Sequence, residues 1–201
     1  MELIPRHKSN STLPARFAGG IFMASLMALL AVASCAPSQL KNLGKVEDFT
    51  LQDVNGNVVQ WKDFRGKPVL AFFGYTYCPD FCPMTLHKLQ KAFDASDEKE
   101  NWPELLFLSV DPEHDSPNDL RKYLSEFTYP ALALTGTDPE LRIAAKQFGV
   151  TFYPSPENPR IIQHSPVLFL IDSSGNIRYL FKFDQTADEL VAVVEELIED
   201  S

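Results

Sequence analysis

Two cysteines separated by three residues, Cys78 and Cys82, are the side chains whose type and spacing most directly indicate chemistry. They lie in the segment 74–83, GYTYCPDFCP, after an apolar run at 69–73 and before a helix-like run at 84–93. Two thiols there can bind a soft metal ion, form a disulfide or attack an oxidant. The dipole and free N–H groups of a helix N-terminus favour the thiolate, which is both metal ligand and nucleophile. The spacing alone leaves all three chemistries open.

The residues around the two cysteines narrow these alternatives. Asp80 places a negative charge beside the thiols and opposes thiolate formation, so we expect it to be a loop residue or a helix N-cap. Pro83 suits the first turn of a helix, and we expect the helix to begin near it. Cys78 and Cys82 can form a disulfide, but closing a loop over so few residues removes little chain entropy. A purely stabilising disulfide is therefore disfavoured.

The rest of the chain alternates strand-like and helix-like segments. Runs of apolar residues predict strands at 69–74, 105–110, 131–134, 167–171 and 177–181. Capping residues or proline at their first turn, or an amphipathic pattern, predict helices at 116–127, 137–149 and 188–199. Asn-Gly at 55–56 predicts a hairpin within 49–61, and the turn 172–176 predicts a second one. This order indicates a layered α/β domain with a thioredoxin-like fold, extended by an N-terminal β-hairpin and closed by a hairpin plus helix.

A stable metal site needs at least a third ligand besides the two thiolates, and three histidines follow residue 35. His87 lies five residues beyond Cys82, off its helical face. His114 lies in a polar loop, where we expect it to be solvated. His164 ends an irregular stretch that begins at residue 153 and precedes the predicted strand 167–171. In a thioredoxin-like fold, the loop that enters this strand packs beside the cysteine loop, so His164 is the candidate third ligand.

The chain resembles the Sco/SenC family of copper chaperones for cytochrome c oxidase over roughly residues 44–200. The resemblance is carried by four motifs: GYTYCPDFCP at 74–83, SVDPEHDSP at 109–117, LTGT at 134–137, and His164-Ser165 ahead of FLID at 169–172. It implies copper bound by Cys78, Cys82 and His164. It also implies that copper passes to the binuclear copper centre of oxidase subunit II or to another acceptor protein, or that the cysteines of that centre are kept reduced.

The donor types agree with this implication. Two soft thiolates and one imidazole suit Cu(I), which accepts low coordination, whereas structural zinc normally takes four ligands. Three ligands also leave one side of the ion open, as a protein that hands copper on requires. The sequence leaves open whether Cu(II) is bound as well, and it does not identify the copper donor. It favours a metallochaperone over an enzyme.

Pro166 supports an alternative function, a thiol–disulfide reductase that uses Cys78 and Cys82. The resembled family commonly has a small non-proline residue there. Counted back from residues 169–172, Pro166 takes the place of the cis-proline beside the active site of thioredoxin-like oxidoreductases, although most X-Pro bonds are trans. Such enzymes typically use a C-x2-C spacing, and they have no need of His164. A thiol peroxidase ranks third, because it needs an activated cysteine, and neither Asp80 nor the prolines of the cysteine loop indicate an activating environment.

The N-terminus predicts export and attachment to a membrane. Residues 1–34 carry three basic side chains and then an uncharged run at 17–33, shorter than the roughly 20 residues that a membrane span needs. Residues 32–35, VASC, resemble a bacterial lipobox, with Cys35 as the lipidated residue. The alternative is an uncleaved signal anchor. We expect a signal peptide at 1–34, a tether at 35–45 and a folded domain at 46–201, on the extracytoplasmic face of a bacterial membrane, which is the periplasmic side where the envelope has two membranes.

The net negative charge of the chain argues against two classes of partner. The chain has a formal charge of −9, and the residues after 34 hold 15 basic and 26 acidic side chains, or about −11. This excess of acid argues against binding to nucleic acid and against electrostatic adhesion to anionic lipid. A lipid anchor at Cys35 would hold the domain at the membrane without such adhesion.

Overall fold

The computed structural model of the protein describes residues 38–200. The predicted signal peptide and Cys35 lie outside the described residues. The strands are β1 (Thr50–Asp53), β2 (Val58–Gln60), β3 (Val69–Gly74), β4 (Glu104–Ser109), β5 (Ala131–Thr135), β6 (Phe152–Pro154), β7 (Ile162–His164), β8 (Leu168–Ile171) and β9 (Ile177–Phe181). The helices are η1 (Trp61–Phe64, a 3-10 helix), α2 (Phe81–Ala95), α3 (Pro117–Leu124), α4 (Asp138–Gln147) and α5 (Ala187–Glu199).

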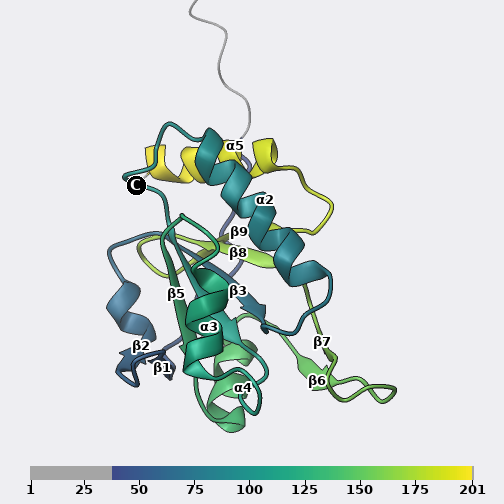
Figure 1. Ribbon diagram of the computed structural model, residues 1–201. Coiled ribbons are helices and arrows are strands. Elements are labelled where there is room, and N and C mark those ends of the chain that lie inside the picture. The colour runs from purple at the N-terminus through teal and green to yellow at the C-terminus, as the bar shows by residue number, and fades with distance from the viewer. Residues whose placement is uncertain (1–37, 201) are drawn as a thin grey trace, which may run out of the picture. The chain divides into compact units, whose positions relative to one another are not determined.

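Seven of the strands form one sheet in the order β2-β1-β5-β4-β3-β8-β9, and β6 and β7 form a separate hairpin. Strand β3 lies between β4, to which it is parallel, and β8, to which it is antiparallel. Helices α2 and α5 pack side by side (Figure 1). This α/β arrangement, with the central βαβ unit followed by an antiparallel hairpin and a closing helix, confirms the predicted thioredoxin-like fold.

The core lies on both faces of β3, all of whose residues are buried. Successive residues of a strand point to opposite faces, so Phe72 and Phe73 enter different layers. The Phe72 ring lies 6.2 Å from that of Phe107 on the neighbouring strand. The Phe73 ring lies edge-on to Phe148, just after α4, at 5.3 Å. The continuous apolar run that predicted this strand therefore reflects burial on both faces.

The folded unit begins earlier than the predicted boundary at residue 46. Residues 41–46 run beside the start of β9, where the Leu43 N–H donates to the Ile177 carbonyl and the Val46 N–H donates to the Gly175 carbonyl. Leu40 and Val46 are buried in the core. Most of the predicted tether is thus part of the compact unit, which starts at Ser38.

Two local predictions near the cysteines need correction, and the bond before Pro166, which the sequence left open, is defined. Helix α2 begins at Phe81 rather than near Pro83, so Cys82 lies inside its first turn. The stretch predicted to be irregular from residue 153 forms the β6–β7 hairpin, with His164 as the last residue of β7. No peptide bond among residues 38–200 is cis, so the bond before Pro166 is trans.

Within the same residues, no helix is both long and apolar enough to cross a membrane.

Candidate metal centre

The cysteine loop leaves the sheet at the C-terminal end of β3, where the backbone of Gly74 passes close to the ring of Phe107. A Cβ atom on Gly74 would lie 2.9 Å from the Phe107 ring, so only glycine fits without displacing that ring. The loop then turns back, and the Cys78 N–H donates to the Tyr75 carbonyl at 3.3 Å. Cys78 is half-buried on the loop, and Cys82 is fully buried in the first turn of α2.

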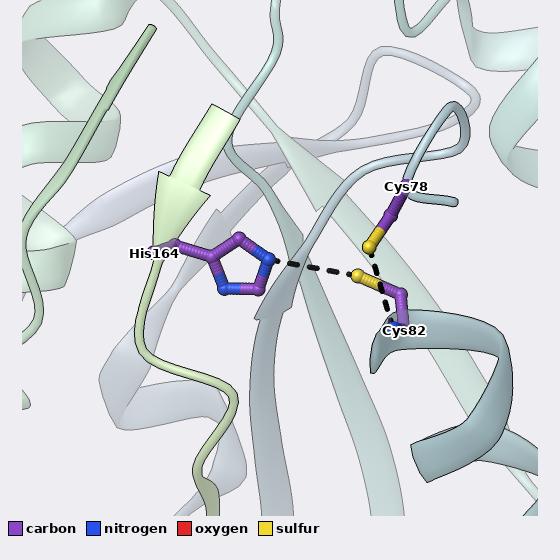
Figure 2. Close-up of side chains that lie close together, drawn as sticks. All are labelled: Cys78, Cys82 and His164. Atoms are coloured by element: carbon purple, nitrogen blue, oxygen red, sulfur yellow. Dashed lines mark hydrogen bonds between the residues drawn. The ribbon is translucent and has the colours of Figure 1, made fainter. Parts of the chain in front are cut away.

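His164 reaches the loop because of how β8 pairs with β3. The two strands are antiparallel, and Leu168 at the start of β8 lies opposite Phe72 near the end of β3. Residues just before β8 are therefore placed beside the cysteine loop. The His164 ring lies edge-on to the rings of Phe72 and Tyr75, with centroids 6.2 and 5.9 Å away. These contacts aim the imidazole at the cysteines (Figure 2).

The structure brings the three sequence-predicted side chains together. The Cys82 sulfur lies 3.6 Å from His164 Nε2, and the Sγ atoms of Cys78 and Cys82 and a ring nitrogen of His164 all lie within 4.8 Å of one another (Figure 2). Both cysteines are free thiols rather than a disulfide. Within residues 38–200, no other acidic, cysteine or histidine side chain joins this group. The set is thus three donors, two of them sulfur.

The hydrogen bond on the far side of the imidazole fixes which nitrogen is available. His164 Nδ1 lies 3.2 Å from the carbonyl oxygen of Ser165. A carbonyl oxygen can only accept, so we assign the proton of the neutral ring to Nδ1. The lone pair of Nε2 then points toward the cysteine sulfurs, which is the arrangement that metal-binding histidines use.

The two thiols differ in acidity because they share a hydrogen bond. The thiol of Cys82 donates to the Cys78 sulfur and, with the backbone N–H groups of Cys82 and Asp80, holds the pKa of Cys78 well below its usual value against the opposing effect of burial. The same hydrogen bond, together with burial, raises the pKa of Cys82. The group that activates Cys78 is thus the second cysteine, rather than the Asp80 side chain or the prolines of the loop.

Asp80 occupies the N-cap position of α2, one of its two expected roles, but its side chain accepts no capping hydrogen bond. The other two histidines lie outside the donor group. His87 is exposed on α2, and its ring lies 5.2 Å from that of Phe127. His114 is exposed as expected, yet its Nδ1 is hydrogen-bonded to the buried carboxylate of Asp111 at 2.7 Å.

The sequence did not indicate the hydrogen-bonding groups around the cysteine loop that hold the three donors in position. The hydroxyl of Tyr75 accepts a hydrogen bond from the Ile162 N–H at 3.1 Å and so joins the cysteine loop to the histidine hairpin. The buried carboxylate of Asp115 is hydrogen-bonded to Thr76. A weak sequence signal was present, because Thr76 and Asp115 follow the predicted strands 69–74 and 105–110, and residues that follow neighbouring parallel strands meet at one edge of the sheet.

Comparison with known families decides the affiliation of the chain. Residues 38–199 match the model of the family described as SCO1/SenC. The chain belongs to the SCO1/SenC family. The mitochondrial SCO1 homolog of Homo sapiens is 32% identical over 151 residues, which cover 73% of this chain and 50% of the human protein. The sco1 protein of Schizosaccharomyces pombe is 32% identical over 155 residues and is covered to 58%. The chain thus spans about half the length of these SCO1/SenC relatives.

Solved SCO1/SenC structures share the fold. ScoI of Arabidopsis thaliana, solved with copper bound, has a TM-score of 0.69 and 31% identity, and the match covers 78% of this chain and 99% of that one. BsSco, a member of the Sco family of cytochrome c oxidase assembly proteins in which a disulfide switch was identified, has a TM-score of 0.64 and 28% identity. That match covers 80% of this chain and 98% of BsSco.

Proposed function

We propose that this SCO1/SenC protein is a metallochaperone that binds one copper ion through Cys78, Cys82 and His164. The observation that carries the proposal is the convergence of two sulfur donors and one imidazole within 4.8 Å. Thiolate and imidazole are the donors that favour Cu(I), and a three-donor set without a fourth ligand disfavours structural zinc. Copper-bound structures of the ScoI proteins of Arabidopsis thaliana and Bradyrhizobium japonicum support the assignment.

Loading and release require only proton and ligand exchange. Copper is bound by thiolates, so the proton that Cys82 shares with Cys78 must leave when Cu(I) enters. On release, Cu(I) moves to the donor atoms of an acceptor, and one proton returns to the pair. No electron is transferred in this step. The half-buried Cys78 sulfur is the natural first contact for an incoming or leaving ion.

The proposed acceptor is the binuclear copper centre of cytochrome c oxidase subunit II. The affiliation with a family whose member BsSco is described as an oxidase assembly protein supports this proposal. The surface next to the cysteines suits a protein partner, because Tyr77 and Phe81 are exposed to 57% and 47%. Exposed apolar groups that lie beside a transfer site are typical of docking surfaces.

We also propose that the protein is lipid-anchored through Cys35 on the extracytoplasmic face of a bacterial membrane. The support is the sequence of residues 1–35, with its basic start, uncharged run and lipobox-like end. Replacement Cys35→Ala is then expected to release the protein from the membrane fraction. A variant that stays with the membrane would indicate an uncleaved signal anchor instead.

Thiol–disulfide reduction is the second candidate function, and the acidity difference between the two thiols favours it. The thiolate of Cys78 attacks a disulfide of the partner protein and expels one partner thiolate, which takes a proton from water. Cys82 then loses its proton and attacks the Cys78 sulfur of the mixed disulfide, and the second partner thiolate leaves and takes up that proton. Two electrons pass to the partner, which leaves with two thiols, while Cys78 and Cys82 become a disulfide. Reduction of the cysteines of the copper centre of oxidase subunit II would be one such reaction.

Titration of the reduced protein with Cu(I), in competition with a chelator, tests the copper function. We expect one ion per chain and a loss of affinity of at least about a hundredfold for His164→Ala, since even the outer partners of metal ligands contribute 10- to 100-fold. His87→Ala and His114→Ala are matched controls and should leave the affinity unchanged. Equal effects of all three replacements would refute this ligand set. Absence of copper binding to the reduced wild type would leave reduction as the function.

A further inference from the structure

Asp115 is a buried carboxylate that the proposed chemistry does not use. It lies between β4 and α3, and only 4% of its surface is exposed. Its Oδ1 accepts hydrogen bonds from the backbone N–H of Thr76 at 3.0 Å and from the Thr76 hydroxyl at 2.6 Å. Its Oδ2 accepts from the hydroxyl of Ser109 at 2.6 Å. Both oxygens are therefore engaged, and two of the three donors belong to one residue of the cysteine loop.

The environment of Asp115 supplies donors in place of a counterion. None of the ion pairs within residues 38–200 involves it. Burial raises its pKa, while the hydrogen bonds from Ser109 and Thr76 act in the opposite direction. Burying a carboxyl group is unfavourable unless hydrogen bonds compensate it. The hydrogen bonds that compensate the burial of Asp115 also fix the positions of their donors.

The group that these bonds hold is the turn between β3 and Cys78. Thr76 lies two residues before Cys78, and the carbonyl of Tyr75, next to it, accepts the hydrogen bond of the Cys78 N–H. On the other side, the Tyr75 hydroxyl is bonded to Ile162 on the hairpin that carries His164. A shift of the turn would therefore move a cysteine and the contact to the histidine strand together.

We propose that Asp115 is a positioning residue for the metal centre: its carboxylate fixes Thr76 and thereby holds Cys78 beside Cys82 and His164 before an ion arrives. The carboxylate does this from the loop that follows the neighbouring strand, because β3 and β4 are in parallel register with Gly74 opposite Ser109. The expected effect of Asp115 on Cu(I) affinity rests on the proposed copper function. The anchoring itself is a property of the copper-free protein.

The test uses three variants of the whole chain, Asp115→Ala, Asp115→Asn and Asp119→Ala. Asparagine keeps an oxygen that can accept both Thr76 bonds, and its amide can donate to the Ser109 hydroxyl. Asp119 is a matched control, because it is an exposed aspartate at the start of α3 that accepts a hydrogen bond from Ser116. Asp119→Ala removes a hydrogen bond at the start of α3, the helix that follows Asp115, and leaves the cysteine loop unchanged. Circular dichroism establishes that each variant is folded at the temperature of the measurements.

Two readouts separate positioning from stability. The first is hydrogen exchange of the Thr76 and Cys78 amides in the reduced, copper-free protein, followed by NMR. The second is Cu(I) affinity, measured by chelator competition. For Asp115→Ala we expect exchange at least about tenfold faster and a copper affinity about 10- to 100-fold lower. For Asp115→Asn most of both properties should return, and for Asp119→Ala neither should change.

Several results would overturn the proposal. One is a folded Asp115→Ala protein with wild-type amide exchange and copper affinity. Another is an Asp115→Asn protein as impaired as Asp115→Ala, since charge rather than hydrogen bonding would then be responsible. If Asp115→Ala does not fold, Thr76→Val removes only the hydroxyl donor and must lower affinity where Thr76→Ser does not. If the wild type binds no copper, the function proposed above fails, while amide exchange still decides the anchoring.

Discussion

The two halves of the metal centre are built in different ways. Cys78 and Cys82 lie at the junction of a 15-residue helix and a fully buried strand in the interior of the seven-stranded sheet. His164 lies at the end of a three-residue strand in a two-stranded hairpin outside that sheet. The cysteine half is continuous with the core. The histidine half is attached to it through the Tyr75 hydroxyl, the buried side chains of Phe152 and Ile162, and a hydrogen bond from Arg142 to the Phe152 carbonyl.

This difference indicates that the two halves of the site have different roles in binding and releasing an ion. A short hairpin opens at a lower free-energy cost than a central strand and its helix, because it buries fewer apolar contacts. The cysteine half can therefore hold an ion in fixed geometry, while the imidazole is the ligand that can withdraw first. A chaperone needs both properties, because it must retain copper and also release it. Variants that affect one half alone show whether these roles are correctly assigned.

The largest expected difference lies within the cysteine half, between the two thiols. Because its pKa is lowered, Cys78 stays ionised below the usual thiol pKa of about 8.5, and its thiolate is lost only as the pH falls through the lowered value. Cys82 is buried and keeps its proton. At neutral pH, iodoacetamide should therefore alkylate Cys78 about a hundredfold faster than Cys82. Peptide-resolved mass spectrometry measures both rates.

The control for this prediction removes the hydrogen-bond donor. In Cys82→Ala the pKa of Cys78 should rise, and its alkylation at neutral pH should slow. Equal rates for the two cysteines in the wild type, or an unchanged rate for Cys78 in the variant, would show that the thiols do not share a proton.

A smaller effect is expected from loosening the histidine half. Tyr75→Phe removes the hydroxyl that accepts from Ile162 and leaves a buried N–H without that acceptor. Copper affinity should fall by about five- to tenfold, which corresponds to the lower end of the roughly 1–3 kcal/mol that an unpaired buried donor costs. Amide exchange should increase in β7 but not in α2. Chelator competition and hydrogen exchange measure these two effects.

Tyr179→Phe is the matched control for Tyr75→Phe. The Tyr179 hydroxyl also accepts one hydrogen bond, from Gln185, but it lies on β9 outside the donor group. It should leave copper affinity unchanged. A loss of affinity common to both variants would mean that general stability, rather than the attachment of the hairpin, limits binding.

Much of the fold could be predicted from the sequence because its main signals are local. The run at 69–74 is apolar throughout since both faces of β3 are buried, and it matches the observed strand, as does the predicted strand at 177–181. The position of His164 before a strand that pairs with β3 was enough to bring it to the cysteines. These inferences needed only element types and the order of the sheet.

The missed features depend on contacts between distant residues. Three-residue strands separated by a turn that contains Pro156 and Pro159 leave no periodic pattern, so the β6–β7 hairpin was not predicted. The Asp115–Thr76 contact joins residues 39 apart, and nothing local to either indicates it. The hydrogen bond that activates Cys78 likewise follows from the position of α2, which begins earlier than Pro83 indicated.

The most direct test of the account is X-ray absorption spectroscopy of the reduced protein loaded with one equivalent of Cu(I). The account predicts two sulfur ligands and one imidazole nitrogen in the wild type, and two sulfur ligands without the imidazole in His164→Ala. A wild-type spectrum that contains only sulfur ligands, or one that His164→Ala leaves unchanged, would contradict it.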